Sequence, residues 1–232
     1  MLLGPNSEEA WPNSHLSAGT IQRIESEITR NLVPVRPLPS APQLTTRMIA
    51  VNALVGLVAS LLVGTAGLQA PETRRSIEVL GILAAGIPTL TLTVSSHMSP
   101  GARVLAYSRF GSFAPLLSIA LLVLLSFPYE KSEQFWSFGF QCLKIGSLSS
   151  LPALALTALH LRRGFPTMRI LQGCRAGVLA GLVGLTVLEI SCPYINRLHV
   201  LVWHLGSAVV ITAIGTAFST LFSPSRRLRV ER

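Results

Sequence analysis

The sequence predicts an all-α membrane protein: a bundle of six transmembrane helices preceded by a short, partly helical N-terminal cytoplasmic arm. Half of the 232 residues are apolar and only 12% are charged, whereas soluble domains carry about 25% charged residues. The apolar residues also gather into six stretches that are long enough to cross a hydrocarbon core of roughly 30 Å as helices. These stretches lie at about 48–68, 79–96, 110–127, 145–161, 170–190 and 198–222.

Prolines and glycines inside these stretches are compatible with helices in a bilayer. The prolines are Pro88, Pro115 and Pro152. In the fifth stretch, glycines recur every four residues, so that they share one helix face and let a second helix approach closely. They are Gly173, Gly177 and Gly181. Gly56 and Gly64 suggest a similar contact for the first stretch.

The distribution of Lys and Arg predicts the orientation in the membrane. With a cytoplasmic N-terminus, 14 of the 19 basic residues fall on the cytoplasmic side and 5 outside, as the positive-inside rule requires. Both termini are then cytoplasmic, and residues 223–232 form a basic tail. The net charge of +9 is explained by this orientation, so we expect no direct contact with nucleic acid. We also expect no cleaved leader, because the first apolar stretch begins late and is long.

Residues 1–47 form the predicted arm, with an amphipathic helix over about 17–32. Four apolar residues share one face of this helix: Ile21, Ile24, Ile28 and Leu32. Ser17 is the expected N-cap, and Pro34 ends the helix and opens an extended Pro-rich linker over 33–42. Since such a stripe is too small to fold alone, it packs on the protein's own loops, on the membrane surface or in a groove on a partner.

No catalytic motif is present in the sequence, so we expect neither an enzyme nor a resident cofactor. It has no His-Glu-x-x-His pair, phosphate loop or dinucleotide fingerprint, and no Cys-x-x-Cys pair for a thiol oxidoreductase. A transporter of metal ions or thiols is the alternative, and it needs polar groups near the bilayer centre. The predicted spans have almost none, and Lys144, Arg175 and Glu189 lie near span ends where they are expected to snorkel to water.

Two cysteines are the candidate sensing residues and candidate metal ligands. Cys142 and Cys192 lie at the outer ends of the fourth and fifth stretches, which form an antiparallel hairpin, whereas Cys174 lies at the inner end. Thiols outside the inner membrane form disulfides or bind soft metal ions, so a switch, a structural disulfide and unlinked thiols all remain open. His199 and His204 are five residues apart, roughly 140° around an α-helix, so we expect that both do not face one ion.

Several of these features together resemble the NrsF-type anti-sigma factors, six-span inner-membrane proteins of Gram-negative bacteria. The resemblance covers about residues 20–225 and does not involve the Phe- and Trp-rich stretch before Cys142. It is carried by four segments: Pro-Val-Arg-Pro-Leu-Pro at 34–39, the segment from Cys142 to Pro152, Leu-Arg-Arg-Gly at 161–164, and Cys192-Pro193.

The resemblance implies a protein of the bacterial inner membrane that holds an extracytoplasmic-function sigma factor away from RNA polymerase. It further implies that Cys142 and Cys192 sense heavy-metal or oxidative stress, with a heavy-metal ion bound at most transiently. The sigma factor would contact the arm. The residues expected to bind it are Ile21, Ile24, Ile28, Leu32, Val35, Arg36 and Pro37.

Overall fold

The computed structural model describes residues 17–31, 40–69, 73–96, 111–129, 135–162 and 169–221, and these are helical apart from short connections. The chain divides into two units, Met1–Pro37 and Leu38–Arg232. In the first unit, α1 (Ala18–Asn31) lies within the range predicted for the arm helix. The Ser17 hydroxyl accepts a hydrogen bond from the Thr20 backbone N–H at 3.3 Å, which satisfies one of the free N–H groups at a helix start.

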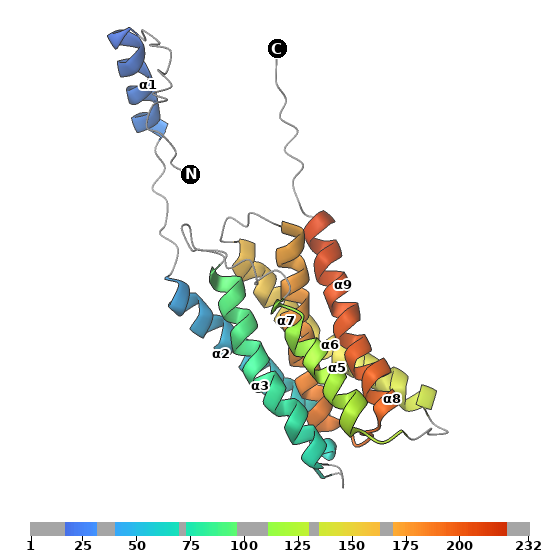
Figure 1. Ribbon diagram of the computed structural model, residues 1–232. Coiled ribbons are helices and arrows are strands. Elements are labelled where there is room, and N and C mark those ends of the chain that lie inside the picture. Colours follow the sequence, from blue (N-terminus) through green and yellow to red (C-terminus); the bar gives the residue numbers. More distant parts are fainter. Residues whose placement is uncertain are drawn as a thin grey trace, which may run out of the picture. The chain divides into compact units, whose positions relative to one another are not determined.

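The second unit is a bundle whose main helices lie side by side (Figure 1). Its elements are α2 (Ala41–Val63), the 3-10 turn η1 (Ala66–Gln69), α3 (Thr73–Ser96), α5 (Ala114–Ser126), α6 (Phe135–Arg162), α7 (Arg169–Ser191), α8 (Arg197–His199), the π-helical turn η2 (Val200–His204) and α9 (Leu205–Leu221). Five helical segments are long and apolar enough to cross a membrane: α2, α3, α6, α7, and α8 continued through η2 into α9. This helix composition is that of a multi-pass membrane protein.

Several helices begin ahead of the predicted spans. Helices α2, α3 and α6 begin at Ala41, Thr73 and Phe135, whereas the predicted spans begin at 48, 79 and 145. Charge marks where a span meets water, and a helix can continue past that level, so the membrane boundaries stay a prediction. Within the third predicted span, 110–127, the described residues include the 13-residue helix α5. Among the described residues, the structure therefore supports five long spans and one short apolar helix.

Helix α7 is the centre of the bundle and packs against α9, α6, α3 and α2. Every residue from 175 to 185 is buried. A Cβ added at Gly173, Gly177 or Gly181 would meet atoms of α9, including its backbone. The predicted close approach along this glycine face is confirmed. Gly64 makes no such contact, and its positive φ of 104° ends α2 instead.

Candidate thiol and metal site

Cys142 and Cys192 lie next to each other at one end of the bundle core. Their sulfur atoms are 3.3 Å apart, and both are buried free thiols. Cys142 lies in α6, and Cys192 directly follows α7, where its backbone N–H donates to the Leu188 carbonyl at 2.8 Å. The predicted closeness of the two helix ends is therefore confirmed. Cys174 lies 18 residues before Cys192, about 27 Å away along a helix.

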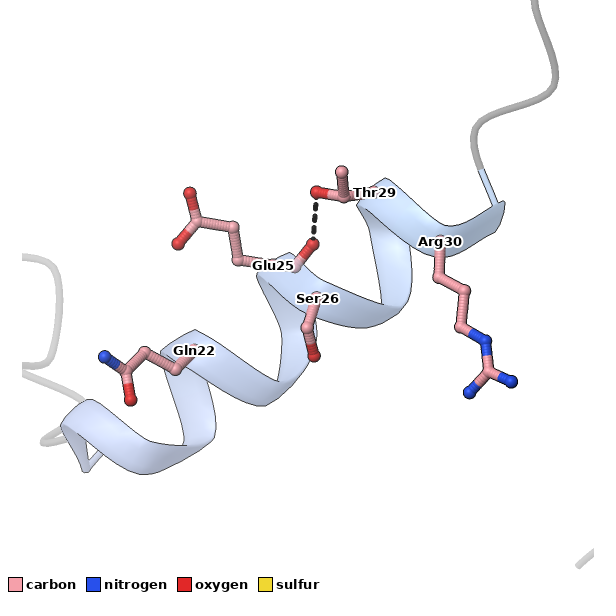
Figure 2. Close-up of a pocket in the computed structure, with 5 residues that line it drawn as sticks. All are labelled: Gln22, Glu25, Ser26, Thr29 and Arg30. Atoms are coloured by element: carbon pink, nitrogen blue, oxygen red, sulfur yellow. Dashed lines mark hydrogen bonds between the residues drawn. The ribbon is translucent and has the colours of Figure 1, made fainter.

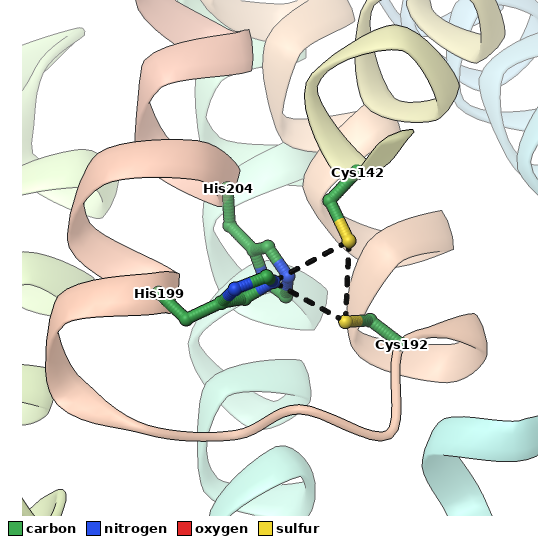
Figure 3. A group of neighbouring side chains, drawn as sticks. All are labelled: Cys142, Cys192, His199 and His204. Carbon is green, nitrogen blue, oxygen red and sulfur yellow. Dashed lines mark hydrogen bonds between the residues drawn. The ribbon is translucent and has the colours of Figure 1, made fainter. Parts of the chain in front are cut away.

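His199 and His204 complete a group of four side chains with the two cysteines, as Figure 3 shows. One ligand atom from each residue lies within 4.8 Å of the others. The Nε2 atom of His199 is 3.4 Å from the Cys142 sulfur and 3.5 Å from the Cys192 sulfur. The expectation that the two histidines cannot face one ion is wrong.

The π-helical turn η2 is the physical reason for this correction. The backbone N–H of Leu205 donates to the carbonyl of Val200, five residues earlier. A π-helical turn, closed by bonds between residues five apart, winds more slowly than an α-helix and so brings such residues closer together around the axis than the roughly 140° of an α-helix. His199 and His204 are five apart, so this turn brings both rings to one side.

The connection between Cys192 and His199 is held in place by hydrogen bonds of Asn196 and Arg197. Asn196 caps α8, its side-chain oxygen accepting from the His199 N–H at 2.8 Å. Arg197 reaches the end of α5, because its backbone N–H donates to the Pro128 carbonyl and its Nε donates to the Phe127 carbonyl, each at 3.0 Å. The position of His199 is thus fixed by α5 as well as by its own helix.

Aromatic rings cover the group on the side of α6. The rings of Phe135, Trp136 and Phe140 lie around Trp203, with centroids 5.4, 5.5 and 5.0 Å away. Gly139 lies directly against the Trp203 ring, where a Cβ would not fit. The Phe- and Trp-rich stretch, which played no part in the resemblance stated from the sequence, therefore forms one wall of this site.

The buried carboxylate of Glu189 contacts His204, one of the four side chains of the group. Glu189 Oε1 accepts a hydrogen bond from His204 Nδ1 at 2.9 Å, and both side chains are fully buried. The expectation that Glu189 and Arg175 snorkel to water is wrong. Arg175 is also fully buried and its Nε donates to the Ser112 hydroxyl at 3.0 Å. Lys144, by contrast, is exposed.

The sequence did contain a pattern that could have indicated the two histidines and Glu189 as part of this site. Glu189 and Cys192 are three residues apart, and His199 and His204 follow within the next twelve residues. Four residues with metal-binding or acid–base side chains in so short a segment of a membrane protein are uncommon, because such groups are costly in lipid unless they are paired.

The hydrogen bond shared with Cys142, together with burial among apolar side chains, raises the pKa of Cys192, while its contact with His199 acts in the opposite direction. The surroundings include the apolar residues Leu188 and Trp203.

Two sulfurs and two imidazoles in this arrangement allow two kinds of chemistry. They can close a disulfide between the thiols, or they can bind a metal ion that prefers sulfur and nitrogen donors.

The residues predicted to bind a sigma factor are placed only in part. Ile21 and Ile24 lie on α1 and are 52% and 48% exposed, and Ile28 belongs to the same helix. Leu32, Val35, Arg36 and Pro37 lie outside the described residues.

A family model described as "NrsF: Negative regulator of sigma F" matches residues 29–222, which is most of the chain and includes the whole Cys/His group. Comparison with curated proteins and with solved structures gave no match. The chain therefore belongs to the NrsF family of negative regulators of a sigma factor, a family of regulators and not of enzymes.

Proposed function

We propose that this chain is an anti-sigma factor of the bacterial inner membrane with a stress-sensing thiol pair. It holds an extracytoplasmic-function sigma factor through its cytoplasmic arm. Heavy-metal or oxidative stress acts on Cys142 and Cys192 and releases the sigma factor. The observation that carries the sensing half of this proposal is the 3.3 Å separation of the two buried sulfur atoms, and family membership supports the regulatory half.

The apolar face of α1 is the proposed start of the sigma-binding surface. Ile21 and Ile24 are about half exposed, and the spacing in the sequence predicts that Ile28 and Leu32 share their face. An amphipathic helix with such a stripe fits a hydrophobic groove on a partner protein. Val35, Arg36 and Pro37 extend the proposed surface into the Pro-rich linker.

A different face of α1 is polar, and Figure 2 shows its side chains. They line an open hollow: Gln22, Glu25, Ser26, Thr29 and Arg30. Thr29 donates its hydroxyl to the Glu25 backbone carbonyl at 2.7 Å, a bond within the helix. Among the described residues, α1 alone lines this hollow, and we assign the contact with the sigma factor to the apolar face.

The proposed topology has six crossings and both termini in the cytoplasm. Helix α5 supplies the sixth crossing, although its 13 residues extend only about 20 Å, so this crossing needs neighbouring residues to complete it. In Figure 1 the start of α2 and the end of α9 lie at one end of the bundle, and α8 lies at the other. An even number of crossings agrees with this arrangement and with the excess of basic residues assigned to the cytoplasmic side.

The proposed signal passes along helices that the sensing site joins. Cys142 belongs to α6 and Cys192 to the end of α7, and both helices run the length of the bundle to the end where α2 begins (Figure 1). A bond that draws the two sulfurs together changes how α6 and α7 pack. Release of the partner requires a change in binding free energy of roughly 1–3 kcal/mol between the two packings.

A pull-down from native membranes tests this function. The full chain, tagged at its C-terminus, is solubilised in mild detergent and its partners are identified by mass spectrometry. We expect a sigma factor with the unaltered chain and its loss with the double substitution Ile21→Glu and Ile24→Glu. Gln22→Ala, on the polar face of the same helix, is the matched control and should retain the partner. Absence of any sigma factor from the unaltered sample would overturn the proposal.

A further inference from the structure

We propose that Cys142, Cys192, His199 and His204 form a four-coordinate site for a divalent ion of the zinc group, Zn²⁺ or Cd²⁺, with Glu189 as the residue that orients His204. This inference rests on the proposed function in taking the two thiols as the sensing residues. It adds two nitrogen ligands from the start of the last membrane helix, and it names the class of ion.

The distances between the donor atoms fit a tetrahedral ion. Bond lengths of about 2.3 Å from zinc to sulfur and about 2.0 Å from zinc to nitrogen hold two tetrahedral sulfurs roughly 3.8 Å apart and a sulfur and a nitrogen roughly 3.5 Å apart. The distances of 3.4 and 3.5 Å from the two sulfurs to His199 Nε2 match the second value. The two sulfurs are 3.3 Å apart, so an ion would move them about 0.5 Å further from each other. The fourth ligand, from His204, lies within 4.8 Å of the others, so a small movement of one ring completes the set.

The free nitrogen of His204 provides an independent observation. Its Nδ1 donates to Glu189 at 2.9 Å, so Nε2 is the ring atom left to bind an ion, and it gives up any proton it carries as it does so. Among the described residues, Nε2 of this fully buried ring makes no well-aligned hydrogen bond, although Cys192 lies close enough to interact with the ring. A buried polar atom without a partner is costly, and a metal ion at the group would satisfy it. A carboxylate behind a ligating histidine is the usual support in zinc sites.

The charge balance and the donor types select the ion. Two thiolates and two neutral imidazoles cancel the charge of a divalent ion, which lowers the cost of burying the ion with its ligands. The Glu189 carboxylate beside them is hydrogen-bonded to His204. On binding, each thiol gives up its proton to solvent as its sulfur bonds to the ion. Sulfur and nitrogen donors suit Zn²⁺ and Cd²⁺, whereas Mg²⁺ and Ca²⁺ require oxygen ligands.

The site would join three separate parts of the bundle. Cys142 comes from α6, Cys192 from the end of α7, and the histidines from α8 and η2 ahead of α9. A disulfide links only the first two of these. Metal binding therefore also restrains the start of the last helix, which a purely oxidative signal does not.

Titration with Co²⁺ tests the ligand set directly. The full chain is purified in detergent, reduced and freed of metal, and Co²⁺ is added while the visible spectrum is recorded. We expect one Co²⁺ per chain, the intense d–d bands of a tetrahedral ion and a thiolate charge-transfer band, all removed when Zn²⁺ or Cd²⁺ is added. No binding, or an octahedral spectrum, would overturn the inference.

Substitutions then separate the four-ligand site from a site made by the cysteines alone. His199→Gln and His204→Gln should each abolish the tetrahedral bands and weaken binding more than 10-fold, and Glu189→Gln should weaken it by about 10- to 100-fold. His160→Gln, on a partly buried ring bonded to the Leu156 carbonyl, is the matched control and should change nothing. If the His199 and His204 variants bind as the unaltered chain does, the inference fails.

Folding and function are checked on the same samples. His204→Cys keeps four soft or borderline ligands and should retain a tetrahedral spectrum with stronger thiolate charge transfer, which a variant that merely misfolds cannot show. Capture of the sigma factor is measured in parallel. A chain that captures its partner but binds no ion overturns this inference alone, whereas a chain that binds the ion but captures no sigma factor overturns the proposed function alone.

Discussion

His204 donates its Nδ1 proton to Glu189 at 2.9 Å, and neither side chain has any exposed surface. Glu189 lies in the last turn of α7 and His204 at the end of η2, so this contact joins two neighbouring membrane helices near the thiols. A buried carboxylate is costly unless it is paired and hydrogen-bonded. The pair therefore restrains the end of α7 against the start of α9 whether or not a metal ion is bound.

Removal of this carboxylate should destabilise the bundle. Glu189→Ala leaves the His204 N–H buried without an acceptor, and we expect the free energy of unfolding to fall by about 1–3 kcal/mol. Glu189→Gln keeps an acceptor and should cost less. Chemical unfolding in detergent, followed by circular dichroism, measures both.

Glu78→Ala is the control, because Glu78 pairs at 3.5 Å with an exposed Arg74. It should change the stability by about 0.5 kcal/mol or less, and equal losses for Glu189→Ala and Glu78→Ala would contradict this assignment.

The same substitution at two glycines should have opposite effects on stability. A Cβ at Gly177 would meet the backbone of Thr212 and the carbonyl of Ile211 in α9, so Gly177→Ala forces the helices apart and should cost about 1–3 kcal/mol. Gly81 lies in α3 with nothing within 4 Å of an added Cβ, and Gly81→Ala should stabilise by about 0.5–1 kcal/mol. Thermal unfolding in detergent measures both. Stabilisation by Gly177→Ala would show that α7 and α9 are not in backbone contact.

The parts of the fold that local spacing determines could be predicted from the sequence. Glycines four residues apart indicated a close helix contact along α7, which the structure forms with α9, and the Ile spacing with Ser17 and Pro34 indicated the arm helix. The closeness of Cys142 and Cys192 followed from a hairpin with a short connection. Each of these predictions depends on the spacing of residues or on the length of a connection, and both can be counted in the sequence.

The histidine ligands could not be predicted, because their placement depends on a change of helix type. Under α-helical geometry His199 and His204 diverge, and only the π-helical turn brings them together. The burial of Glu189 and Arg175 also depends on tertiary packing, since a charged residue near a span end reaches water unless neighbouring helices enclose it. The bundle therefore does contain buried ionisable groups, contrary to the expectation that disfavoured a transporter, and membership of a family of regulators disfavours a transporter instead.

Mild oxidation should link Cys142 to Cys192 and leave Cys174 out. The two sulfurs need to move from 3.3 Å to the disulfide length of about 2.05 Å, a shift that rotation of the side chains together with a small movement of α6 against α7 can supply. Diamide treatment of the purified chain, followed by proteolysis and mass spectrometry without reduction, should yield one cross-linked peptide pair. A Cys174 cross-link within one chain would contradict the placement of that residue at the other end of α7.

Loss of both sensing thiols should make the complex with the sigma factor insensitive to stress. In membranes from cells exposed to Cd²⁺ or peroxide, the unaltered chain should retain less sigma factor, because a coupling of roughly 1–3 kcal/mol changes the affinity about 5- to 150-fold. With Cys142→Ser and Cys192→Ser together, the amount retained should be the same with and without exposure. Cys174→Ser is the matched control, since it removes a thiol that lies away from the site, and it should respond as the unaltered chain does. The measurement is the ratio of sigma factor to tagged chain in the pull-down. If the double variant still releases its partner on exposure, Cys142 and Cys192 are not the sensor.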